Sequence, residues 1–84
     1  MPITLTILRP FVEEKKTVDW VSLECAGGSF VVSEGHRPLI NVLSGEGTIT
    51  YRQAGQEIEI PVPAEGGLVH VVSNQVILFL HTAI

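Results

Sequence analysis

The stretch "ITLTIL" (residues 3–8) decides the fold class. Isoleucine or leucine at positions 3, 5 and 7 alternates with threonine at positions 4 and 6. Successive side chains of a strand point to opposite faces, so this alternation produces one apolar face and one polar face. Side chains branched at Cβ also fit a pleated strand better than a helix. The stretch therefore predicts a strand with one buried face.

Similar segments follow along the whole chain, each bounded by Gly, Pro, Asn or Ser. They are "TVDWVSLE" (17–24), "SFVVS" (29–33), "PLINVL" (38–43), "GTITYRQ" (47–53), "QEIEIPV" (56–62), "LVHVVS" (68–73) and "QVILFLHT" (75–82). Short strands with turn signals about every 8 to 12 residues are typical of an all-β sandwich or barrel. We predict an all-β fold, a small antiparallel β-sandwich of about eight to ten short strands with essentially no helix. Residues 1–84 are expected to form a single domain.

Several local patterns refine this expectation. The glycine pairs at 27–28 and 66–67 mark turns where positive φ is needed. Pro61 and Pro63 lack an amide hydrogen, so the strand ending "IEIPVP" is expected at a sheet edge or a bulge. The charged run Glu13–Lys16 is interpreted as a solvated connection between the first two strands, and Trp20 as core or rim packing.

The last predicted strand differs from the others because Val76–Leu80 is apolar on both faces. One face of a sandwich strand normally meets water. We therefore expect a second burial partner for this strand, either a loop of the same chain or another subunit.

Composition excludes several classes of protein. The chain has 84 residues and a net charge of −4, and nine acidic against five basic residues give no basic block for phosphates. We expect no nucleic-acid partner.

The longest apolar run, Val76–Leu80, is far shorter than the roughly 20 residues that span a bilayer, so direct membrane insertion is not expected. The single Cys25 cannot form an internal disulfide, which favours a reducing, cytosolic environment.

Candidates for catalysis and metal binding are few. Cys25 follows Glu24, whose charge would raise a thiol pKa, and no cation stands beside it, so we interpret it as an inert thiol. His36, His70 and His81 form no HxH or HExxH pair. A lone histidine on a strand is more typical of a surface or interface. We therefore expect no catalytic residue, no metal and no cofactor.

One competing pattern is that of cupins, which are β domains that bind metals or small molecules. "GLVHVVSN" (67–74) matches the second cupin half-motif, with Gly67, His70 and Asn74 at the required spacing. The first half-motif holds two histidines one residue apart and a glutamate, but "RPLINVLSG" after His36 supplies no second histidine and no acid. A cupin-like domain stays open as the alternative, as does a β-sandwich interaction module of another assembly.

A family resemblance appears at "VDWVSLECAGGSFVVSEGHRPLINVL" (18–43). This stretch resembles the amino-terminal β-sandwich domain of the ATP synthase epsilon subunit, called delta in mitochondria, whose motif is "GILPGHAPLL". The opening "ITLTILRP", "GTITYR", "EGGLVHV" and "NQVILFLHTAI" resemble further family segments. Glu34, Val31 and Arg37 stand where the family has proline, glycine and alanine. The helical hairpin that follows this domain in many members has no counterpart in the sequence.

The resemblance implies a non-catalytic central-stalk (rotor) subunit of a rotary ATP synthase, helping to couple proton flow to ATP synthesis. Its implied partners are the gamma subunit and the polar loops of the c-ring, at the cytoplasmic face of the inner (plasma) membrane. The family's glycine-histidine tip faces the c-ring, which would place Ser29, Glu34, His36 and Arg37 there. Arg9 and Asn41 match positions near the gamma and ring contact. His36 would exchange hydrogen bonds across the interface, and Arg37 would pair with ring carboxylates or helix-end carbonyls.

Overall fold

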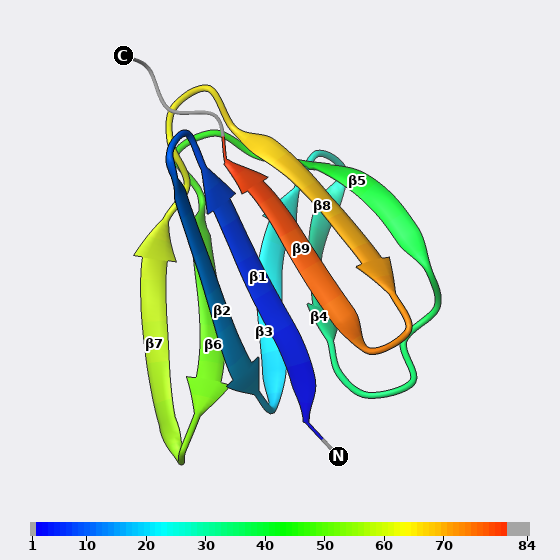
Figure 1. Cartoon of the computed structure of the whole chain (residues 1–84). Helices are drawn as coiled ribbons and strands as arrows, with labels where there is room; N and C mark the ends of the chain where they lie inside the picture. Colours follow the sequence, from blue (N-terminus) through cyan, green and yellow to red (C-terminus); the bar gives the residue numbers. More distant parts are fainter. Residues whose placement is uncertain (1, 81–84) are drawn as a thin grey trace.

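The computed structural model describes residues 2–80, and these form nine strands and no helix (Figure 1). The strands are β1 (Ile3–Arg9), β2 (Val12–Val18), β3 (Trp20–Cys25), β4 (Gly28–Val32), β5 (Leu39–Leu43), β6 (Thr48–Gln53), β7 (Gln56–Pro61), β8 (Gly67–Val72) and β9 (Gln75–Leu80). The predicted all-β fold is confirmed. The part of the last predicted strand beyond Leu80, with His81, lies outside the described residues.

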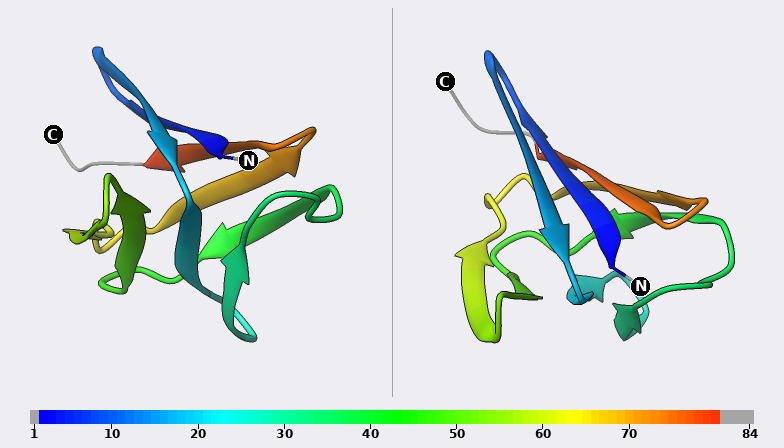
Figure 2. Two further views of the ribbon diagram at one scale, coloured as in Figure 1. Left: turned by 90° about the horizontal axis from the view of Figure 1, so that it is seen from below. Right: turned by 60° about the horizontal axis from the view of Figure 1, so that its bottom comes forward.

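The strands form one continuous sheet that folds over into two layers (Figure 2). The first layer runs β2-β1-β9-β8-β5, and the second contains β3, β6 and β7, with β4 on the other side of β3. A single pair, Cys25 with Leu43, links the layers between β3 and β5. Neighbouring strands are antiparallel except β1 and β9, which run parallel. Because β1 and β9 come from opposite ends of the sequence, no tight turn forces them to be antiparallel.

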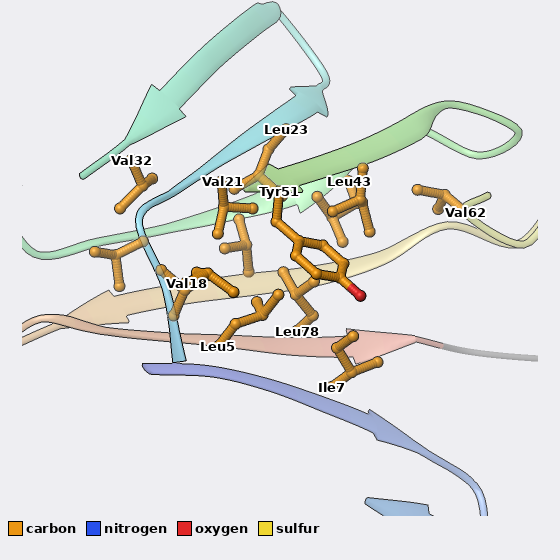
Figure 3. Close-up of a cluster of buried hydrophobic side chains, with 14 of the residues drawn as sticks. Leu5, Ile7, Val18, Val21, Leu23, Val32, Leu43, Tyr51, Val62 and Leu78 are labelled. Carbon is orange, nitrogen blue, oxygen red and sulfur yellow. The ribbon is translucent and has the colours of Figure 1, made fainter. Parts of the chain in front are cut away.

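The core fills the space between the two layers (Figure 3). Ile3, Leu5 and Ile7 are each at most 1% exposed, as their alternation with threonine predicts. Leu78 on β9 and Tyr51 on β6 lie in the same cluster. Among residues 2–80, no polar or charged residue other than this tyrosine is buried. The core is therefore held together by apolar packing, which accounts for most of the stability of a small sandwich.

The charged run Glu13–Lys16 is not a connection, and that prediction is wrong. It lies within β2, which pairs along its whole length with β1. β2 is an edge strand with both faces largely in water, so it needs no apolar alternation. The predicted strand 17–24 is divided at Asp19, between β2 and β3. The expected edge position of the strand ending at Pro61 is confirmed, because β7 ends the sheet.

Candidate interaction surfaces

The outer surface of the first layer carries a row of apolar side chains. Leu8 on β1 pairs with Phe79 on β9, Phe79 pairs with Leu68 on β8, and Leu68 pairs with Val42 on β5. Phe79 is 43% exposed, Leu68 46% and Val42 51%. Directly paired residues share one face of a sheet, so the four side chains form a continuous stripe.

A second row lies beside the first, where Ile77 on β9 pairs with His70, and His70 pairs with Ile40 on β5. We call the two rows together, Leu8, Ile40, Val42, Leu68, His70, Ile77 and Phe79, the outer face. Val76 and Leu78 point into the core, while Phe79 remains 43% exposed with no loop covering it among residues 2–80. Of the two expected burial partners for the last strand, another subunit is the one that this arrangement favours.

A groove of about 400 Å³ deepens one end of the outer face. Its lining consists of Leu8, Arg9, Pro10, Gly67, Leu68, Phe79 and Leu80. Gly67 has no side chain, and a Cβ there would meet the carbonyl oxygen of Phe79 at 2.3 Å. This close approach brings the β8 and β9 backbones together below the groove. The mostly apolar lining fits a protein side chain better than a charged ligand.

Arg9 lies at the rim of the groove and is held by its own chain. Its Nη1 donates a hydrogen bond to Oε1 of Glu14 at 2.7 Å, across the β1–β2 pair. Nζ of Lys16 lies 3.5 Å from the other carboxylate oxygen of Glu14. The hydrogen bond from Arg9, with help from Lys16, holds the pKa of Glu14 below its ordinary value, although partial desolvation acts in the opposite direction.

We expect the replacement Arg9→Met to raise the pKa of Glu14, because the largest lowering contribution is removed. A lowered pKa in the folded state stabilises the fold above the unfolded pKa, and this contribution is lost as pH falls through the folded pKa. Arg9→Met should therefore reduce the acid dependence of stability. NMR titration of the Glu14 carboxyl measures the pKa. The matched control is Arg52→Met, which removes the ion pair with Glu57 and should leave Glu14 unchanged.

The glycine-histidine segment forms a loop over residues 33–38, between β4 and β5. Gly35 has φ of 79°, and the amide of His36 donates to the carbonyl of Ser33 at 3.2 Å, closing a turn. The amide of Gly35 also donates to Oδ1 of Asn74 at 2.9 Å. The backbone carbonyl of Asn74 in turn accepts from the amide of Thr4. The β8–β9 turn thus fastens this loop, and Glu34 in place of proline is compatible with the turn.

His36 and Arg37 are presented differently by this loop. The His36 ring lies 6.1 Å from the Phe30 ring, centroid to centroid, and its Nδ1 donates to the carbonyl of Arg37 at 2.8 Å. His36 is half-buried and held in place, whereas Arg37 is exposed. Of the five basic residues, the other four form ion pairs. Arg37 is thus the one cation without a carboxylate partner in the described part of the chain, and it is available to another molecule.

The remaining predicted site residues do not gather around this loop. Ser29 lies at the start of β4, beside the β3–β4 turn, so the length of the strand separates it from Glu34. The structure therefore does not place Ser29 on the same tip as His36. Asn41 is half-buried on β5, on the inward-facing side opposite Ile40 and Val42, and its Oδ1 accepts from the amide of Val42. Arg9 lies at the far end of β1.

Sequence reasoning missed two features of these surfaces. The outer face was visible only as apolar excess on the last strand, since its rows depend on strand pairing. Asn74 was noticed for its spacing from Gly67 and His70, yet its side chain bonds the amide of Gly35. His70 meanwhile lies between Ile77 and Ile40 on the outer face. Within residues 2–80, no group of three or more His, Cys, Asp or Glu side chains could hold a metal ion.

Cys25, the other residue weighed for chemistry, is buried at 5% exposure, and burial raises the pKa of its thiol. A raised pKa keeps the thiol protonated and weakly nucleophilic.

Among residues 2–80 there is no helix that is long and apolar enough to cross a membrane. The outer face and the loop 33–38 are the distinctive surface features of this small β-sandwich.

Comparison with known proteins places this sandwich in a family. The ATP synthase epsilon chain of Frankia casuarinae is 32% identical over 84 residues, covering 99% of this chain and 96% of the relative. No family model matches the sequence. The chain belongs to the ATP synthase epsilon chain family. Its role is accordingly that of a non-catalytic rotor subunit.

Two solved structures share the fold. A chain of the Euglena gracilis mitochondrial ATP synthase, solved by cryo-EM as OSCP, F1 and c-ring, matches with a TM-score of 0.84 at 20% identity. A chain of the Tetrahymena thermophila mitochondrial ATP synthase central stalk and c-ring matches with a TM-score of 0.77 at 17% identity. The alignments cover 94% and 93% of this chain but only 50% and 62% of those chains. This chain thus corresponds to about half of the length of the first.

Proposed function

We propose that this chain binds the gamma subunit through the outer face and the polar loops of the c-ring through the loop 33–38. In this arrangement it is a central-stalk subunit that holds the rotor together, so that torque passes between the ring and the catalytic head. Family membership and the partnerless outer face support this proposal. The apolar stripe Leu8, Phe79, Leu68 and Val42, of which the last three side chains are exposed, is the observation that carries it.

The energetics favour a protein partner on the outer face. Removing apolar surface from water stabilises a complex by roughly 25 cal/mol per Å². The exposed parts of Phe79, Leu68 and Val42 would contribute this free energy only when a partner covers them. Interface centres are typically apolar and poor in charge. In the outer face only His70 carries an ionisable group, so a partner covering this face buries no carboxylate, lysine or arginine there. A standard interface of roughly 800 Å² per partner would extend beyond the two rows onto neighbouring polar residues.

The loop 33–38 offers a different kind of contact. Arg37 has no carboxylate partner within residues 2–80, and a guanidinium can donate to carboxylates or to carbonyls at helix ends. His36 contributes a ring already fixed by Phe30 and the Arg37 carbonyl, so little side-chain entropy is lost on binding. We assign Glu34, His36 and Arg37 to the c-ring contact. This contact would place the chain peripherally, on the cytoplasmic face of the membrane.

A direct test mixes the purified chain with gamma subunit from the same organism and measures the complex by size exclusion. We expect a stable complex at micromolar concentration. The absence of a complex under these conditions would contradict the proposed gamma contact. A c-ring contact alone would then be the remaining basis for a place in the rotor.

We expect His36→Ala combined with Arg37→Ala to weaken the c-ring contact roughly tenfold, because charge-assisted hydrogen bonds are lost. Proton pumping by the reconstituted ATP synthase should fall, while the thermal unfolding of the isolated domain stays nearly unchanged. The control is Arg52→Ala, which removes a cation from β6 that is already paired with Glu57. Unchanged pumping in the double variant would remove these residues from the interface.

A further inference from the structure

The tip of the β1–β2 hairpin has an unusual residue at its sharpest point. Arg9 pairs with Val12, so the turn consists of Pro10 and Phe11 alone. The ring of Pro10 fixes its φ at about −65°. Phe11, the next residue, has φ of 68°. Negative φ followed by positive φ is the pattern of a type II turn, which favours glycine at its second central position. Phenylalanine therefore stands where the backbone calls for glycine.

The Phe11 side chain also makes no packing contact that would stabilise the fold. It is 102% exposed, so its ring touches no other part of the described chain. The other non-glycine residues with positive φ among residues 2–80 are small or polar: Glu46, Ala54, Ser73 and Asn74. A left-handed conformation is unfavourable for a residue with a Cβ, and a bulky apolar ring in water adds to this cost. Neither cost is offset by a contact within residues 2–80.

The position of Phe11 connects it to the outer face. Pro10 lines the groove together with Leu8 and Phe79, and Val12 on the other side of Phe11 is half-exposed. Apolar surface thus continues from the outer face, over the groove, to the hairpin tip, which projects away from the rest of the sandwich in Figure 2. Backbone strain that persists without structural compensation points to a functional site.

We infer that Phe11 is an anchor residue that inserts into an apolar pocket of the gamma subunit when gamma covers the outer face. This inference rests on the proposed function. Aromatic side chains dominate binding energy at interfaces because they bury a large area with few rotatable bonds. The short hairpin and the rigid proline hold the ring extended before binding, so little ordering entropy is lost.

Two other partners for Phe11 fit less well. The loop proposed for the c-ring lies near Thr4, whereas Phe11 follows Arg9 at the other end of β1, roughly 20 Å away at about 3.3 Å per residue. The two contacts therefore belong to opposite ends of the molecule. A lipid surface is disfavoured because Glu13 and Glu14 follow the tip and the chain carries a net charge of −4. Acidic surfaces are repelled by anionic membranes.

The variant Phe11→Gly separates binding from folding. Glycine accepts the positive φ, so we expect the melting temperature to stay the same or to rise by a few degrees. The dissociation constant for gamma, measured by titration calorimetry, should increase by about tenfold or more. The matched control is Ala54→Gly, which relieves the same kind of strain at the β6–β7 turn, where φ is 52°. Its affinity for gamma should match that of the unmodified chain.

The outcomes distinguish this inference from the proposed function. If the unmodified chain forms no complex with gamma, the proposed docking fails and the anchor fails with it. If the unmodified chain binds and Phe11→Gly binds within about twofold, only the anchor is overturned. Flotation with vesicles of anionic phospholipid tests the lipid surface in parallel. Vesicle binding that depends on Phe11 would assign the ring to the membrane and likewise overturn the inference.

Discussion

A chain carrying Leu68→Asp together with Phe79→Asp should lose binding to gamma, with a dissociation constant raised by roughly a hundredfold or more. These residues pair directly across β8 and β9 at the middle of the apolar stripe. Each aspartate would have to be buried without a partner when gamma covers the outer face, and burial of an unpaired carboxylate is very costly. Both positions are more than two-fifths exposed in the free chain, so the fold itself should tolerate the change. Calorimetric titration with gamma measures the loss.

A matched control for this double variant is Val31→Asp. Val31 is 55% exposed on β4, in the other layer of the sandwich. The substitution adds the same charge to an equally exposed apolar position away from the outer face. We expect it to leave the affinity for gamma within about twofold, since exposed positions outside an interface contribute little. Equal losses for both positions would contradict the assignment of the docking face.

The variant Gly66→Ala should lower the free energy of unfolding by about 2 to 4 kcal/mol. Gly66 has φ of 77°, and its place in a glycine pair predicts this positive value. The residue is also buried. A Cβ at this position would lie 2.7 Å from the carbonyl oxygen of Leu43, so backbone would have to shift. Alanine therefore adds both conformational strain and overpacking next to the strand that carries Leu68. Urea unfolding monitored by circular dichroism measures the change.

The control variant Gly55→Ala separates the conformational cost of positive φ from the cost of overpacking. Gly55 has nearly the same φ, 79°, but nothing lies within 4 Å of a Cβ at that turn. Only the conformational cost applies, so we expect a loss of about 1 kcal/mol. A loss at Gly66 no larger than that at Gly55 would show that the close approach to Leu43 has no energetic consequence.

The fold was largely predictable because local patterns govern it. Alternation at residues 3–8 identified β1 and its buried face, and Pro61 identified the edge strand. The run Glu13–Lys16 was wrongly predicted to be a connection, because an edge strand exposes both faces and needs no apolar residues. Its pairing with β1 follows from a two-residue turn that contains no glycine. Local propensity alone therefore could not identify β2.

The surfaces were less predictable because they depend on contacts between distant segments. "PLINVL" shows that strand β5 is apolar, yet only its pairing with β8 reveals that Ile40 and Val42 face outward. Leu8 joins Phe79 because β1 and β9 run parallel, which no local signal indicates. Likewise, the spacing of His70 and Asn74 resembles a metal motif, but the fold directs one to the outer face and the other to the loop 33–38.

The most direct measurement is site-specific photo-crosslinking in the assembled ATP synthase of the same organism. A photoreactive phenylalanine analogue at position 68, on the outer face, should crosslink to gamma. The same analogue at position 59, exposed on the edge strand β7, should give little or no gamma adduct. Gamma adducts from position 59 but none from position 68 would contradict docking through the outer face.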